Sequence, residues 1–126
     1  MNNTPTHFPK NLLTPVGNFL SLQIKKLERR KKEVSKEDPF ANLNRQSEKA
    51  APDAEAEEQV AHLRSMAVEV QLQRKIIQTR RALARVKIGT YGICENCGNM
   101  IDTDRLMIYP EATLCVTCEK RKERKK

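Results

Sequence analysis

The sequence has no tryptophan, and aromatic residues make up only 4% of its 126 residues. It also has no apolar run approaching the roughly 20 residues that span a bilayer. Charged residues, by contrast, account for 32% of the chain. This composition provides too little apolar material for a large globular core, so we expect one small domain with extensions. We also expect a soluble cytoplasmic protein that does not associate with membranes.

The four cysteines fall into two Cys-x-x-Cys pairs, Cys94 with Cys97 and Cys115 with Cys118, separated by residues 98–114. Each pair can hold one metal ion through two thiolates, and the second pair completes a tetrahedral four-sulfur site. Gly98 suits the tight turn that such a pair requires. Because four sulfurs leave no open position for water or substrate, we expect one structural zinc ion and no hydrolytic chemistry.

Two disulfides are the main alternative use of these cysteines. The first residues contain no apolar segment of signal-peptide length, which favours a reducing compartment. Paired Cys-x-x-Cys motifs in such a compartment indicate a metal site, with iron in the same sulfur geometry as the remaining alternative.

The net charge of +8 is distributed unevenly along the chain. Basic residues cluster at 25–32, 74–87 and 120–126, whereas acidic residues gather at 48–58. A basic chain suggests a polyanionic partner, so a nucleic-acid-binding zinc module is one functional hypothesis. The scarcity of aromatic residues and the lack of a recognition-helix motif argue against specific readout, so we expect no direct specific DNA binding.

Two helices are predicted before the cysteines. The first begins at Thr14-Pro15, after a flexible lead-in at residues 1–14, and ends near Lys36. The second extends from Pro52 to a stop at Gly89. The predicted apolar seam of the first helix comprises Leu20, Ile24, Leu27, Lys31 and Val34. That of the second comprises Leu63, Val70, Ile77 and Ala84, joined by Val60, Ala67 and Ile88 and widened toward the C-terminal end by Ile76 and Leu83.

These patterns predict a mainly α protein in which an antiparallel coiled-coil helical hairpin at residues 15–88, with a loop at about 37–52, precedes a zinc-finger module at 89–126. Phe40 is a candidate for pinning the loop to a helix. Residues 100–110 are expected to form a short β-hairpin, and the chain should end in a short helix with a basic tail. The expected core around the metal comprises Tyr91, Leu106, Tyr109 and Leu114.

Residues 82–98, which include the Gly-x-Tyr-Gly-x-Cys lead into the first cysteine pair, carry a family resemblance. Together with Ile101, Arg105-Leu106, Pro110, Ala112 and Leu114-Cys115, they resemble the DksA/TraR family. The resemblance implies a transcription regulator that binds RNA polymerase and inserts its hairpin into the secondary channel of the enzyme. The acidic residues of the hairpin tip would then be Asp53, Glu55, Glu57 and Glu58.

The sequence departs from that family pattern in two respects. Glu55 stands where the family's Asp-x-Ala tip has alanine, and Tyr109 and Glu119 stand where members that respond to guanosine tetraphosphate have basic residues. Direct binding of this nucleotide is therefore not expected.

The sequence favours two further classes of function less. A structural coiled-coil adaptor would pair chains through the seam at 63, 70, 77 and 84, but Arg74 and Arg81 interrupt it, so we expect a monomer. An enzyme is the least favoured class, since His7 and His62 are isolated and no nucleophile and base can be paired.

Overall fold

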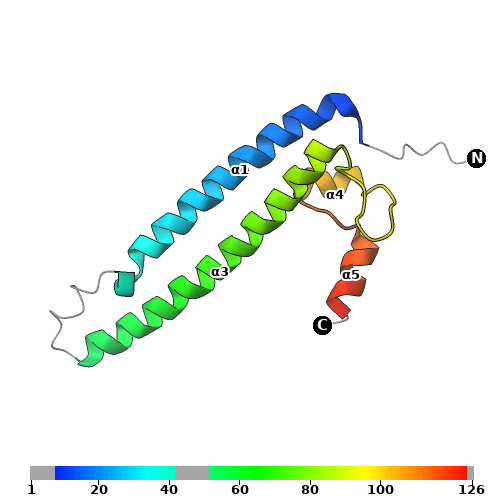
Figure 1. The fold of residues 1–126 in the computed structure, drawn as a ribbon. Helices are drawn as coiled ribbons and strands as arrows, with labels where there is room; N and C mark the ends of the chain where they lie inside the picture. Colours follow the sequence, from blue (N-terminus) through cyan, green and yellow to red (C-terminus); the bar gives the residue numbers. More distant parts are fainter. Residues whose placement is uncertain (1–7, 42–51, 125–126) are drawn as a thin grey trace, which may run out of the picture. The chain divides into compact units, whose positions relative to one another are not determined.

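The computed structural model describes residues 8–41 and 52–124, and the described parts contain helices but no named β-strand (Figure 1). The elements in chain order are α1 (Lys10–Glu37), the short 3-10 helix η1 (Pro39–Ala41), α3 (Pro52–Ile88), α4 (Thr103–Ile108) and α5 (Val116–Arg124). The predicted mainly α fold with a short C-terminal helix is confirmed. Within the described ranges, no helix is both long and apolar enough to cross a bilayer.

The chain divides into two compact units. One is formed by Lys25–Ile76, and the other combines the residues up to Ile24 with those from Ile77 onward. Both α1 and α3 contribute residues to each unit. We call Lys25–Ile76 the central unit, and we call the unit that contains the four cysteines the metal unit.

The metal unit is built around a cluster of buried apolar residues. Tyr91 and Leu106, both predicted, belong to this cluster, and Tyr109 and Leu114 pack against it as partly buried residues. Phe8 joins the cluster from the N-terminal side, its ring meeting that of Tyr91 edge-on with 5.1 Å between centroids. Gly92 is needed at this contact because a Cβ there would lie 3.0 Å from the Phe8 ring. The remaining members are Leu20, Ala82, Cys94, Ile101, Ala112 and Cys118.

In the central unit, α3 contacts α1, the residue Asp38 that links α1 to η1, and η1 itself. The Lys31 ammonium donates to Oε1 of Gln73 at 2.6 Å. Nδ1 of His62 lies 2.7 Å from a carboxylate oxygen of Asp38, and the Phe40 ring stacks on the imidazole with centroids 4.4 Å apart. Phe40 therefore packs against a helix, as the sequence analysis proposed, although the segment 42–51 that follows lies outside the described residues.

Helix α1 begins earlier than the sequence predicted. It starts at Lys10 instead of Thr14-Pro15, and Pro15 lies inside it. The amide of Leu12 donates to the carbonyl of Pro9 at 3.1 Å in the first turn, and Leu13 and Val16 pack against the metal unit's core. Burial of these side chains offsets the hydrogen bond that Pro15 cannot donate, which explains the error.

The predicted seam of α1 agrees with the burial of its residues, whereas the heptad positions predicted for α3 are wrong. Leu20 and Val34 are buried on α1. On α3, by contrast, Leu63 is 64% exposed, and Val60, Val70, Ile77 and Ile88 are also exposed. Of the residues predicted to widen the α3 stripe, Ile76 is buried and Leu83 packs against the core of the metal unit. The other buried residues of α3 are Glu58, Thr79 and Ala82, and because two of these are polar, counting apolar residues missed them.

The termination of α3 is as predicted. Gly89 adopts a φ of +93°, and its amide and that of Thr90 donate to the carbonyls of Val86 and Arg85 at 3.2 and 2.9 Å. This pair of bonds is a Schellman motif, which satisfies carbonyl groups at a helix end and requires a left-handed residue.

The β-hairpin predicted at 100–110 is wrong. Residues 103–108 form α4, capped by the Asp102 side chain, which accepts a hydrogen bond from the Asp104 amide at 3.0 Å. One isolated antiparallel bridge, between Ile93 and Met100, is the only β pairing recorded in the described ranges. The Asp-x-Asp cap favours a helix more strongly than the short apolar pattern favours a strand.

Candidate metal centre

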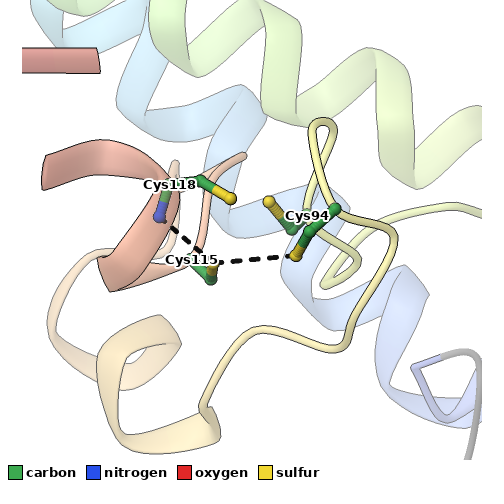
Figure 2. A group of neighbouring side chains, drawn as sticks. Cys94, Cys115 and Cys118 are labelled. Carbon is green, nitrogen blue, oxygen red and sulfur yellow. Dashed lines mark hydrogen bonds between the residues drawn. The ribbon is translucent and has the colours of Figure 1, made fainter. Parts of the chain in front are cut away.

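The four cysteines converge in the metal unit from two stretches of chain. Cys94 and Cys97 lie in the segment that follows α3, Cys115 directly precedes α5, and Cys118 is in the first turn of that helix. Their sulfur atoms all lie within 4.8 Å of one another. In Figure 2 the side chains of Cys94, Cys115 and Cys118 point toward a common centre. The predicted metal ligands are thus brought together by the fold.

The sulfur geometry fits a tetrahedral metal ion. A Zn–S bond of about 2.3 Å implies about 3.8 Å between sulfurs at the corners of a tetrahedron. The Cys97 and Cys115 sulfurs are separated by 3.8 Å, and none of the four cysteines forms a disulfide. Four sulfurs at these distances suit zinc and fill its coordination sphere, so the donor set matches a structural site.

Backbone turns hold the first cysteine pair in place. The Gly98 amide donates to the Cys94 carbonyl at 3.1 Å, with Gly98 at a φ of +77°. The Cys94 amide donates to the Asn99 carbonyl at 2.8 Å, and the Glu95 amide donates to the Thr113 carbonyl at 2.9 Å. The bond from Glu95 to Thr113 joins the first cysteine pair to the segment that leads into the second pair.

Hydrogen bonds also reach the sulfur atoms. The Asn96 side-chain amide donates to the Cys118 sulfur at 3.3 Å, and the backbone amide of Cys118 donates to the Cys115 sulfur at 3.5 Å. Donors of this kind orient the ligands and delocalise thiolate charge. Asn96 was not predicted as part of the site, because its contact depends on α5 folding back beside the first cysteine pair.

The folded chain gives its thiols different acidities. Burial raises the pKa of Cys94, but this effect is outweighed by hydrogen bonds from the backbone amides of Cys97, Cys115 and Asn96, so the pKa falls to about 6. At Cys118 the Asn96 amide acts to lower the pKa, but hydrogen bonds with the other cysteines and burial raise it to about 11. Metal binding at neutral pH must therefore displace protons from at least part of the site.

Side chains of α3 attach the cysteine segments to the helix within the metal unit. Gln78 donates to the Glu111 carbonyl at 2.7 Å and to the Thr113 hydroxyl at 3.2 Å. Arg85 donates to the Ile93 carbonyl at 3.0 Å and lies 3.7 Å from the Glu95 carboxylate. Sequence reasoning missed both residues, since their polar character alone does not distinguish them from solvent-facing residues.

The predicted tip acids occupy the first turns of α3 and are not equivalent. Glu55 and Glu57 are exposed, whereas Glu58 is only 9% exposed. Asp53 lies within the bounds of α3, but its side chain is outside the described residues. Acidic residues at this position complement the positive end of the helix dipole in any case. Two carboxylates, Glu55 and Glu57, are thus available to solvent.

Neither of the two positions where nucleotide-responsive members have basic residues carries a cationic side chain in this protein. Tyr109 is the C-cap residue of α4. The central carbon of the Arg105 guanidinium lies over the Tyr109 ring, 5.4 Å from the centroid of that ring. Glu119 is in the first turn of α5. Of the two isolated histidines, His62 contacts Asp38 as described above, and His7 lies outside the described residues.

Comparisons with known proteins place the cysteine region in a family. Residues 89–124 match the prokaryotic dksA/traR C4-type zinc finger. The chain is 44% identical to the RNA polymerase-binding transcription factor DksA of Caulobacter vibrioides across 42% of its own length and 38% of the relative's. It is 46% identical to the Protein TraR of Escherichia coli K12 across 33% of its own length and 63% of the relative's.

These matches span less than two thirds of each curated relative. Among solved structures, the chain is similar to transcription factor DksA2 from Pseudomonas aeruginosa, with a TM-score of 0.72 and 22% identity. That similarity covers 91% of this chain and 85% of the other. It supports the same fold along nearly the whole chain.

Proposed function

Because the chain belongs, through its C4-type zinc finger, to the DksA/TraR family, we propose that it is a transcription regulator that binds bacterial RNA polymerase. The observation that carries the proposal is the combination of the matched finger at 89–124 with a DksA-like fold over 91% of the chain. A relative over the matched region is named as an RNA polymerase-binding factor. The protein would act as a regulator in the bacterial cytoplasm, not as an enzyme.

One zinc ion, held by Cys94, Cys97, Cys115 and Cys118, would have a structural role. When bound, it supplies cross-linking of the two cysteine segments and no open coordination position. The residues of the chain contribute the rest: Gly98 shapes the first turn, Asn96 donates to a ligand sulfur, and Gln78 and Arg85 attach the segments to α3. In our proposal, this module at 89–126 supports the helices at 15–88 without taking part in chemistry.

The acidic start of α3 is the part that we propose to act on polymerase. By family resemblance, the helical hairpin would enter the secondary channel and bring Asp53 and Glu55, with Glu57, near the catalytic centre. Exposure of Glu55 and Glu57 supports this role. Glu58 is the weakest of the four candidates because it is buried.

Nucleotide dependence and oligomeric state are the two further parts of the proposal. Tyr109 and Glu119 offer no cation to a phosphate, so we propose action independent of guanosine tetraphosphate. The arginines that interrupt the outward apolar stripe of α3, Arg74 and Arg81, support a monomer. Specific DNA recognition is not part of the proposal.

The test is a transcription assay with bacterial RNA polymerase and the zinc-loaded protein. We expect the wild type to bind polymerase and to change transcript yield, and Asp53→Asn/Glu55→Gln to bind similarly while losing the effect. The matched control is Glu33→Gln/Glu37→Gln, which removes the same charge from exposed positions of α1. Equal loss of effect in both double variants would refute a specific role for the start of α3.

A further inference from the structure

Three residues join the segment after α1 to the first part of α3 within the central unit. Nδ1 of His62 lies 2.7 Å from Oδ2 of Asp38, and the Phe40 ring stacks on the imidazole at an interplanar angle of 27°. The other carboxylate oxygen of Asp38 accepts a hydrogen bond from the Phe40 amide at 3.0 Å. We call Asp38, Phe40 and His62 the η1 clamp, because one carboxylate both orders η1 and attaches it to α3.

The contacts of the η1 clamp are shielded from water. The side chains of Asp38 and His62 are 11% and 28% exposed, so water competes weakly for their hydrogen bond. Burial raises the pKa of Asp38, but hydrogen bonds from the Phe40 amide and from His62 outweigh this effect, and the pKa is lowered. The carboxylate is therefore ionised and only accepts, so Nδ1 of His62 carries a proton and donates it. Hydrogen bonds to an ionised acceptor are shorter and stronger than neutral ones.

The η1 clamp lies close to the exposed acidic residues of α3. His62 follows Glu57 by five residues and Glu55 by seven, so all three lie within about 10 Å along the helix axis. The first four amides of a helix have no acceptor inside it, and helix ends open easily unless packing holds them. Glu58, one turn before His62, is buried. The clamp thus supplies tertiary support directly behind the turns that carry the acidic residues.

We propose that the three residues of the η1 clamp are positioning residues, which hold the start of α3 so that Glu55 and Glu57 are presented in one direction. The inference rests on the function proposed above, because it assigns the clamp a part in the effect of these acidic residues on polymerase. The clamp acts through them and does not itself contact the enzyme. A displacement of about 1 Å in a group that acts on a reaction can remove most of its effect, so a contact two turns away can control the outcome.

A purely stabilising role for the same contacts makes a different prediction. In that case, losing a clamp contact lowers the fraction of folded protein, and adding more protein restores the full effect on transcription. A positioning role instead lowers the maximal effect at saturating protein and leaves the half-maximal concentration nearly unchanged. The two roles are therefore separated by a titration and not by stability alone.

The first measurement is hydrogen exchange of the zinc-loaded full chain without polymerase. It follows the amides of residues 56–61, the first in α3 that have acceptors inside the helix. His62→Phe keeps a ring beside Phe40 and removes the donor to Asp38. Loss of this hydrogen bond should speed exchange at 56–61 about fivefold or more, because the first turns of α3 open more often.

Two further variants isolate the hydrogen bond of the η1 clamp. Gln73→Met is the matched control, since it removes the hydrogen bond from Lys31 in the same unit, and it should change exchange at 56–61 less than about twofold. His62→Asn places an amide donor close to the position of Nδ1 and should recover part of the protection lost in His62→Phe. Equal exchange at 56–61 in His62→Phe and Gln73→Met would overturn the proposal.

The second measurement is the transcription assay with polymerase, titrated to saturating protein. His62→Phe should reduce the maximal change in transcript yield at least about threefold and shift the half-maximal concentration less than about twofold, whereas Gln73→Met should match the wild type. A full maximal effect of His62→Phe at raised concentration would overturn the proposal in favour of a stabilising role. If the wild type itself leaves transcription unchanged, the function proposed above fails, and hydrogen exchange still decides whether the clamp orders the start of α3.

Discussion

Tyr91 joins the beginning of the metal-binding segment to the chain before the second cysteine pair. Its hydroxyl donates to the Pro110 carbonyl at 2.8 Å, and its ring meets Phe8 edge-on. Burial, with a smaller contribution from the Glu111 carboxylate, raises the pKa of Tyr91 to about 12. The neutral phenol is therefore the form that the folded chain favours.

Replacing this hydroxyl should alter both stability and its pH dependence. Tyr91→Phe removes one hydrogen bond and should lower the free energy of unfolding by about 0.5–1.5 kcal/mol at neutral pH. Since the folded pKa is above the unfolded value, the wild type should lose stability as pH rises from about 10 toward 12, and the variant should lose less. Urea unfolding of the zinc-loaded proteins across this range measures both. Identical alkaline losses would show that another group is responsible.

The thiols make metal affinity depend on pH in a defined way. Cys94, with a pKa of about 6, is already a thiolate at neutral pH, whereas Cys118, with a pKa of about 11, must lose its proton on binding. Apparent zinc affinity should therefore fall as pH falls, and the slope should steepen below about pH 6, where Cys94 also becomes protonated in the free protein. Chelator competition from about pH 5 to pH 8 tests this, and a constant slope through pH 6 would contradict the assigned acidity of Cys94.

At the scale of elements, α3 shows how polar pairs can decide which face of a helix is buried. Lys31 with Gln73 and Asp38 with His62 occupy contacts of α3 with α1 and η1 in the central unit. The apolar residues Leu63 and Val70 are exposed. An apolar heptad predicted the wrong face, because periodicity reports where apolar residues repeat and not which partner lies opposite.

Two neighbouring isoleucines of α3 provide a matched test of this assignment. Ile76 is 2% exposed and Ile77 is 53% exposed, so Ile76→Ala should lower the free energy of unfolding by about 2–4 kcal/mol. Ile77→Ala should change it by less than about 1 kcal/mol, because the same change in helix propensity occurs with little loss of burial. Denaturant unfolding measures both variants. A larger loss at Ile77 would place the heptad position that the sequence predicted, and not Ile76, at the buried face.

Local signals account for the elements that the sequence predicted correctly. The Pro52 start of α3 and its Gly89 stop depend on backbone preferences that neighbouring residues determine. The early start of α1 and the formation of α4 were missed because one depends on packing of Leu13 and Val16 and the other on a cap at Asp102. The first of these errors is therefore a tertiary effect, whereas the second overlooked a local capping signal that the sequence carries.

At the scale of the whole molecule, the metal site was the most predictable feature, because ligand identity and spacing suffice to define it. The residues around the metal site were less predictable from the sequence. Asn96, Gln78 and Arg85 act through contacts that exist only once α3, α5 and the cysteine segments are folded. Family resemblance supplied the proposed partner, which no charge or periodicity pattern identifies.

The most direct test of the central claim is photo-crosslinking to bacterial core RNA polymerase from a photoreactive residue placed at Glu57, an exposed position near the start of α3. The same residue at Ile88, exposed at the end of α3, serves as the control position. We expect zinc-dependent binding, with the position 57 crosslink mapping beside the polymerase catalytic centre and the position 88 crosslink mapping elsewhere. Zinc-loaded protein that fails to bind polymerase, or a position 57 crosslink remote from that centre, would contradict it.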